Sequence, residues 1–167
     1  MKTEKKILQL SIKGPKVMDI PAKKALYISL TGRYGSLDFS GSWQRLWQFV
    51  KENKLFSAGM EHIAIYHDDP KVTESEKLRT DICLTIKKEA RPQGEIGVKE
   101  IKGGKFAMFL YKGSYDHLDE VYNTIYSKLL PDNNLRLRDY HCFEKYLNHP
   151  GKTVPEKLKT EIYIPVE

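Results

Sequence analysis

Hydrophobic side chains recur along this chain with two different spacings, and one of them predicts helices. Trp43, Leu46, Trp47 and Val50 are separated by three or four residues, with polar side chains between them. That spacing places all four on one side of a helix. A second stripe of the same kind follows, formed by Leu118, Val121, Tyr122, Ile125 and Leu129. Pro131 is expected to end the second helix, because proline lacks the N–H that a helix interior uses.

The second spacing is an alternation of apolar and polar residues, which is typical of strands. It occurs in residues 66–86 and 146–166, which align at an offset of eighty without a gap. Eight of these twenty-one positions are identical, and they include the pair Pro70 and Pro150. Such agreement exceeds what two unrelated strands would share, so the chain contains an internal repeat.

The repeat extends upstream, where residues 16–34 align with residues 97–115. Each of these stretches has two extended segments joined by a short turn, and "KGG" in the second copy suits a hairpin loop. The expected order is therefore strand–strand–helix–strand–strand, twice, with repeat one at about 16–86 and repeat two at about 97–166. Residues 87–96 link the two repeats.

These elements predict the fold class α+β. A duplicated strand–helix–strand–strand unit would form antiparallel sheets with pseudo-twofold symmetry, and each helix would cover one sheet face. We expect a single domain over 1–167, because this length suits one domain of ordinary size. The symmetry axis is the natural place for a central ligand cleft.

Alternation also predicts which side chains share a face. The apolar residues of the last strand in each half, from Ile82 to Ile86 and from Ile162 to Val166, should pack under the helices. Ile63, Ile65, Phe143 and Leu147 are expected to join them. The opposite face would then carry Glu144, Tyr146 and Tyr163. Glu144 aligns with Ala64 in the repeat, so the two halves differ at this position.

Composition and charge exclude several classes of protein. The net charge is 28 − 22 = +6, but the basic residues are scattered and no recognition helix or RNA-binding motif accompanies them, so direct nucleic-acid binding is not expected. No stretch has the length of a membrane span or the layout of a signal peptide. The two cysteines, Cys83 and Cys142, make no disulfide framework. A cytoplasmic location and no membrane association are expected.

No cofactor or metal is expected from the motifs. The five histidines show no metal-ligand spacing. No phosphate-binding loop, dinucleotide fingerprint or nucleophile elbow is present.

The motifs "IAIYHDDP…EKLRTDICLTI" and "CFEKYLNHP…EIYIPV" resemble those of the GyrI-like family from about Val17 to Val166. This family also supplies the effector-binding domain of AraC-type and MerR-type multidrug-responsive regulators. The resemblance implies a cleft between the repeats that binds cationic or amphipathic compounds, with Glu144 as the pocket acid. Only about fifteen residues precede the repeat here, so no DNA-binding domain is expected in front of it.

The candidate ligand-binding residues combine this acid with aromatic side chains, which attract organic cations. They are Glu144, Tyr146, Tyr163, Tyr66, Tyr27, Phe109, Tyr111 and Tyr115. Trp43 and Trp47 are expected in the core, since they lie on the helical stripe.

Three functions stay open. The first and preferred one is a standalone small-molecule binding protein that acts in drug or toxin sensing, in sequestration or in transcriptional regulation. The family also implies a hydrolase of strained cyclopropane rings, for which Glu161, Asp81, Tyr111 or Tyr115 could supply a second acid–base group. The third is a modulator of DNA gyrase that acts by protein interaction, so gyrase or a regulator protein is a possible partner.

Overall fold

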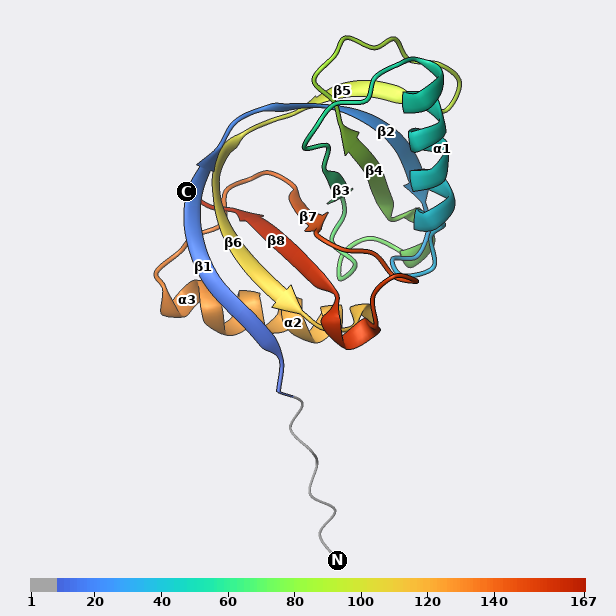
Figure 1. The fold of residues 1–167 in the computed structure, drawn as a ribbon. Helices are drawn as coiled ribbons and strands as arrows, with labels where there is room; N and C mark the ends of the chain where they lie inside the picture. Colours follow the sequence, from blue (N-terminus) through green and yellow to red (C-terminus); the bar gives the residue numbers. More distant parts are fainter. Residues whose placement is uncertain (1–8) are drawn as a thin grey trace, which may run out of the picture.

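The computed structural model describes residues 9–167, and the first eight residues of the predicted domain lie outside the described part (Figure 1). Eight strands form one antiparallel sheet. They are β1 (Ser11–Ile20), β2 (Lys23–Thr31), β3 (His62–Tyr66), β4 (Arg79–Thr85), β5 (Gly97–Ile101), β6 (Gly104–Lys112), β7 (Cys142–Tyr146) and β8 (Lys159–Pro165). Among the described residues, two longer helical segments accompany the sheet, in addition to short 3₁₀ turns at Ser75–Lys77, Tyr115–His117 and Pro155–Lys157. The first is α1 (Phe39–Glu52), and the second comprises α2 (Leu118–Thr124), a π turn (Ile125–Leu129) and α3 (Leu130–Asp132).

The strand order shows the predicted pseudo-twofold symmetry. The order is β1-β6-β8-β7-β3-β4-β2-β5. If each strand is replaced by its counterpart in the other repeat, the same order results in reverse. The axis therefore passes between β3 and β7, which pair at the centre of the sheet. The predicted α+β class and duplicated architecture are confirmed.

The two expected hairpins do not form. β1 pairs with β6 and β2 pairs with β5, while β1 and β2 do not pair with each other. Ile20 lies opposite Gly104 and Lys23 opposite Ile101, so the register continues unbroken across both short connections. Each predicted hairpin is thus one long bent strand, and the two long strands run along each other (Figure 1). The residues at these connections are compatible with a bend as well as with a hairpin turn, so the prediction of two hairpins was wrong.

Because the long strands pair with each other as well as with the central strands, the sheet curves back on itself. Its inner face is filled by a cluster of apolar side chains that includes Ile63, Ile65, Phe106, Phe143 and Tyr163. The expectation that Ile63, Ile65 and Phe143 pack under the helices is therefore wrong. The central strands are covered on both faces, so their apolar residues do not reveal which face meets a helix. Leu147 lies beyond the end of β7 and is 45% exposed.

Both helical segments pack on the outer face of the sheet, as the helical stripes predict. From α1, Leu46, Phe49 and Val50 are buried in one cluster with Ile82, Leu84 and Ile86. From the second segment, Val121 and Ile125 are buried in another cluster with Ile162, Ile164 and Val166. The last strand of each half therefore faces a helix, as expected.

The start of α1 is set by a single side chain, whereas the second helical segment runs on past its proline. Asp38 caps α1 by accepting a hydrogen bond from the amide of Gly41 at 2.9 Å. Pro131 does not end the second segment, which continues to Asp132. Pro131 lies just beyond the π turn (Ile125–Leu129), where the hydrogen-bond pattern of the helix changes. No helix in residues 9–167 is long and apolar enough to cross a membrane.

Candidate functional site

The centre of the sheet presents three cross-strand pairs to the outer face, between the two helical segments. The middle pair is Ala64 and Glu144, and the pseudo-twofold axis passes through it. His62 lies opposite Tyr146 on one side of the axis, and Tyr66 lies opposite Cys142 on the other. Residues directly opposite in an antiparallel pair share a face. Glu144 therefore stands at the symmetry centre, in the gap between α1 and α2. The expectation that Glu144 and Tyr146 lie on the face away from the helices is wrong, because both line the cleft between them.

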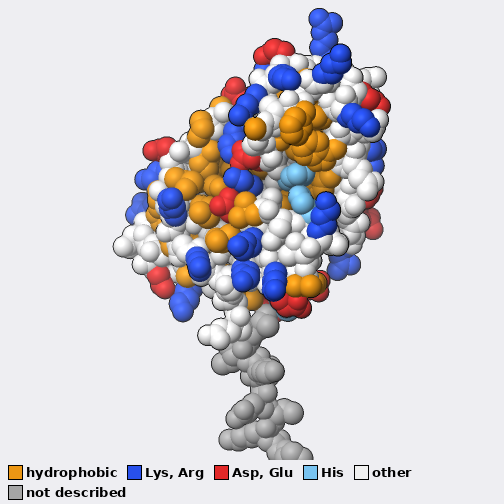
Figure 2. Space-filling view, viewed as in Figure 1, with side chains coloured by type: hydrophobic (Ala, Val, Ile, Leu, Met, Phe, Trp, Pro, Cys, Tyr) orange, Lys and Arg blue, Asp and Glu red, His pale blue; other side chains and the backbone are white. Residues whose placement is uncertain are grey.

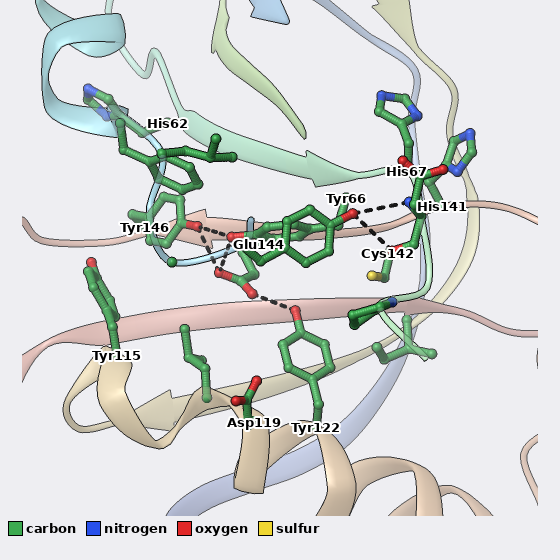
Figure 3. A pocket seen from close by; sticks show the side chains of 18 of the residues that line it. His62, Tyr66, His67, Tyr115, Asp119, Tyr122, His141, Cys142, Glu144 and Tyr146 are labelled. Carbon is green, nitrogen blue, oxygen red and sulfur yellow. Dashed lines mark hydrogen bonds between the residues drawn. The ribbon is translucent and has the colours of Figure 1, made fainter. Parts of the chain in front are cut away.

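Three tyrosine hydroxyls surround the carboxylate of Glu144 (Figure 3). Tyr146 and Tyr66 donate to Oε1 at 2.7 and 3.2 Å, and Tyr122 donates to Oε2 at 2.5 Å. The hydroxyls of Tyr66 and Tyr146 are also 3.1 Å apart. The donors come from β3, β7 and α2, so the tertiary structure, rather than any one segment, assembles this group.

The carboxyl group of Glu144 is buried, with only 1% of the residue exposed. Burial raises its pKa, and the hydrogen bonds from Tyr122, Tyr146 and Tyr66 offset part of this effect. None of the ion pairs formed within residues 9–167 involves Glu144. A buried acid with hydrogen-bond donors and no basic partner is a group whose charge a bound cation would stabilise.

Aromatic rings extend the site on both sides of the acid. Tyr34 packs edge-on against Tyr66, with ring centroids 5.0 Å apart, and Tyr115 packs in the same way on Tyr146 at 5.9 Å. These two pairs are related by the repeat. Burial, together with a smaller effect of the nearby Glu144, raises the pKa of Tyr115 to about 12. The tyrosines therefore stay protonated at neutral pH and present neutral rings and hydroxyl donors.

These residues line a broad cleft of about 2240 Å³ between the two helical segments. Trp43 and Trp47 of α1 form one wall, and Tyr122 and Tyr126 of the second segment form the other. One face of the molecule shows patches of hydrophobic side chains, with a histidine beside one of them and charged groups around them (Figure 2). The mixture of a large aromatic surface with a few polar groups is typical of a small-molecule site.

The cleft contains four of the eight candidate residues, namely Glu144, Tyr146, Tyr66 and Tyr115. Tyr163 and Tyr27 need correction, because both lie on the inner face of the sheet. The ring of Tyr163 stacks on Phe143 at 4.6 Å. The β7–β8 register places Ile162, not Tyr163, opposite Glu144.

Phe109 and Tyr111 also lie outside the cleft lining. Both are buried in the cluster under α2, with 0% and 1% of the residue exposed. The hydroxyl of Tyr111 donates to the carbonyl oxygen of Ser114 at 2.7 Å, so its polar end is satisfied inside the fold. The side chains of Phe109 and Tyr111 lie on the face of β6 that packs against the second helical segment. Alternation along the strand shows that the two share a face, but not which face that is.

The cleft also contains aromatic residues that the sequence assigned to the core or did not single out. Trp43 and Trp47 were expected in the core, but their rings are only partly buried and border the cleft. Tyr122 lies on the predicted stripe and yet contributes the shortest hydrogen bond to Glu144. The tyrosine hydroxyl was the feature of the sequence that could have indicated this role, because the hydroxyl of a buried tyrosine needs a polar partner. Within residues 9–167, no group of three or more His, Cys, Asp or Glu side chains could hold a metal.

The curved, duplicated sheet with an acid and aromatic rings at its symmetry axis is the architecture of a small-molecule binding domain. The chain belongs to the GyrI-like small molecule binding domain family, whose model matches residues 14–167. It is 31% identical over 130 residues to "DNA gyrase inhibitor 2" of Dickeya dadantii (strain 3937), which covers 76% of this chain and 80% of that protein.

Solved structures share the fold. The "EcmrR C-terminal domain" superimposes with a TM-score of 0.71 and 20% identity, covering 96% of this chain and 99% of that one. "SAV2435 bound to TETRAPHENYLPHOSPHONIUM" superimposes with a TM-score of 0.62 and 18% identity, covering 93% of this chain and 94% of that one.

Proposed function

We propose that this protein binds cationic or amphipathic aromatic compounds in the cleft, and that it acts in sensing or sequestering them. The observation that carries the proposal is Glu144, a buried carboxyl that receives three tyrosine hydrogen bonds and forms no ion pair within residues 9–167. An organic cation would supply the missing positive charge. The surrounding rings would add about 0.5–2 kcal/mol for each well-placed cation–π contact.

A structural relative with a bound organic cation supports this proposal. The structural relative SAV2435 was solved with tetraphenylphosphonium, a permanent cation with four aromatic rings. That compound cannot donate a hydrogen bond, so its attraction to a site depends on charge and on contact with rings. It is therefore a suitable probe of the cleft of this protein.

The test is titration calorimetry of the protein and of Glu144→Gln with tetraphenylphosphonium. Glutamine keeps the size of the side chain and removes its negative charge. We expect the variant to bind at least tenfold more weakly, which corresponds to about 1.4 kcal/mol. Glu161→Gln is the matched control, because Glu161 pairs with Lys145 on the inner face of the sheet. Equal affinities of wild type and Glu144→Gln would contradict the proposal.

The gyrase and hydrolase alternatives lead to different results. A relative is named for inhibition of DNA gyrase, and co-purification of gyrase subunits with this protein would favour that role. For a hydrolase, Asp81 and Glu161 were the candidate second carboxylates. They lie opposite Ile65 and Lys145 in the strand register and so do not share the face of Glu144. Turnover of a strained electrophile that is lost in Glu144→Gln would favour a hydrolase.

A further inference from the structure

Another polar side chain of the cleft, His62, lies at one end of the central strand pair. His62 lies directly opposite Tyr146 and is therefore the diagonal neighbour of Glu144 on the same face. Diagonal neighbours across an antiparallel pair are about 7–8 Å apart. A ligand of one or two aromatic rings can span that distance, so His62 and Glu144 can contact opposite ends of the same molecule.

The hydrogen-bonding state of His62 is fixed by α1. The indole Nε1 of Trp47 donates to His62 Nε2 at 2.9 Å. An indole nitrogen is only a donor, so His62 Nε2 accepts and the proton of the neutral ring is on Nδ1. No hydrogen bond from Nδ1 is formed within residues 9–167. The ring therefore presents one N–H donor that the described part of the fold does not use.

The surroundings keep the ring neutral. Burial, together with a smaller effect of the nearby His149, lowers the pKa of His62 to about 4. The ring of His149 packs edge-on at 4.5 Å and that of Trp43 at 4.9 Å. A neutral donor between flat aromatic surfaces does not repel a cation bound at Glu144.

The internal repeat shows that this end of the cleft differs from the other. His62 aligns with Cys142 at the offset of eighty, and Trp47 aligns with Tyr122 in the helical stripes. Tyr122 of one repeat thus donates to the acid Glu144, while the equivalent Trp47 of the other repeat donates to a histidine, His62. The symmetric scaffold holds two chemically different ends.

We propose that Trp43, Trp47, His62 and His149 form a second subsite, which takes a planar aromatic group that carries a hydrogen-bond acceptor such as a carbonyl oxygen. The inference rests on the proposed function, because the cationic end of the same ligand lies at Glu144. The preferred ligand is then an amphipathic molecule with a cation at one end and an acceptor-bearing ring at the other. The indoles contact the ring, and His62 Nδ1 donates to the acceptor.

The test uses two probes of nearly equal shape, 4-acetylbenzyltrimethylammonium and 4-isopropenylbenzyltrimethylammonium. Both carry the same cation and ring, but only the acetyl probe has a carbonyl oxygen. Calorimetry should show that the wild-type protein binds the acetyl probe about fivefold more tightly, which corresponds to about 1 kcal/mol for one neutral hydrogen bond. Both tryptophans of the chain border the subsite, so binding should also change their fluorescence.

Substitution then locates the preference. In His62→Phe, which keeps a flat ring and removes the donor, the ratio of the two affinities should fall to about one. His141→Phe is the matched control, because His141 lines the cleft at the other end, next to His67. It should keep the fivefold ratio. Circular dichroism and thermal unfolding establish that each variant is folded.

The outcomes separate this inference from the proposed function. If Glu144→Gln leaves the affinity of both probes unchanged, the proposed function fails. If both affinities depend on Glu144 but the wild-type protein binds the probes equally, only the second subsite is refuted. A preference that persists in His62→Phe refutes it as well. The ratio of the two probe affinities is measured on the wild-type protein without any variant. The comparison of the two probes therefore still decides the question if His62→Phe does not fold.

Discussion

Removal of a single hydroxyl group, in Tyr122→Phe, would test the energetics of the buried acid. Tyr122 provides the hydrogen bond to Oε2 of Glu144, at 2.5 Å, while the other two tyrosines bond to Oε1. The change therefore leaves one carboxylate oxygen without a tyrosine donor in a buried site. Hydrogen bonds to charged groups contribute about 1.5–3 kcal/mol. We expect the free energy of unfolding at pH 7 to fall by about that amount.

The expected pH dependence follows from the raised pKa of Glu144. Because burial raises the folded-state pKa above the ordinary value of 4.5, the folded protein binds more protons than the unfolded chain in the interval between the two values. The contribution of Glu144 to stability is therefore greatest below the unfolded-state pKa and is lost as the pH rises through the folded-state pKa. The hydrogen bond from Tyr122 stabilises the ionised form, so its removal should raise the pKa further. The loss of unfolding free energy caused by Tyr122→Phe should then be smaller at low pH, where Glu144 is protonated.

Urea unfolding at several pH values measures this cost, and a double-mutant cycle with Glu144→Gln assigns it to the pair. The matched control is Tyr126→Phe. The ring of Tyr126 stacks on Tyr122 at 6.3 Å, but its hydroxyl forms no hydrogen bond with Glu144. It should change stability by less than about 1 kcal/mol. If Tyr122→Phe costs the same in the Glu144→Gln background, or the same at every pH, the carboxylate is not the source of the effect.

Two further predictions concern the scaffold. Burial raises the pKa of Asp81, but hydrogen bonds from His67, Lys99 and Ser29 outweigh it and hold the pKa well below its ordinary value. Asp81→Asn should therefore lower the free energy of unfolding, measured with urea at pH 7, by about 3 kcal/mol. The difference between variant and wild type should shrink as the pH falls below 3.8, because the stability that ionised Asp81 contributes is lost as the pH falls through its folded-state pKa. Gly103→Ala should lower the free energy of unfolding by about 1–3 kcal/mol, because the methyl group of the alanine would overlap the backbone around Ile20. An unchanged melting temperature would show that the two long strands are not tightly apposed there.

The fold class could be predicted because the evidence for it is local and is present twice. The helical stripes around Leu46 and Val121 and the repeat at an offset of eighty required no knowledge of which strands pair. The hairpins could not be predicted correctly. A connection of two residues suits a tight turn, and only the pairing of the two long strands shows that the chain bends there instead.

The same limit applies to the site. Glu144 and its neighbours Tyr146 and Tyr66 were candidates from the repeat and the family motif, and the structure brings them together with Tyr115. Tyr163 was assigned to the same face because strands alternate, but alternation fixes which residues of one strand share a face, not which residues of two strands do. That relation depends on register, which placed Ile162 opposite the acid.

The sequence by itself determined the elements, their duplication and the difference between Glu144 and Ala64 at equivalent positions. These properties depend on the periodicity of side chains along one chain, which a reader of the sequence can measure directly. Only the tertiary structure decided that the helices and the acid share the outer face, and that Tyr122 and Trp47 point into the cleft. Those facts depend on strand register and helix rotation, which are fixed by packing between distant segments and leave little trace in the local pattern.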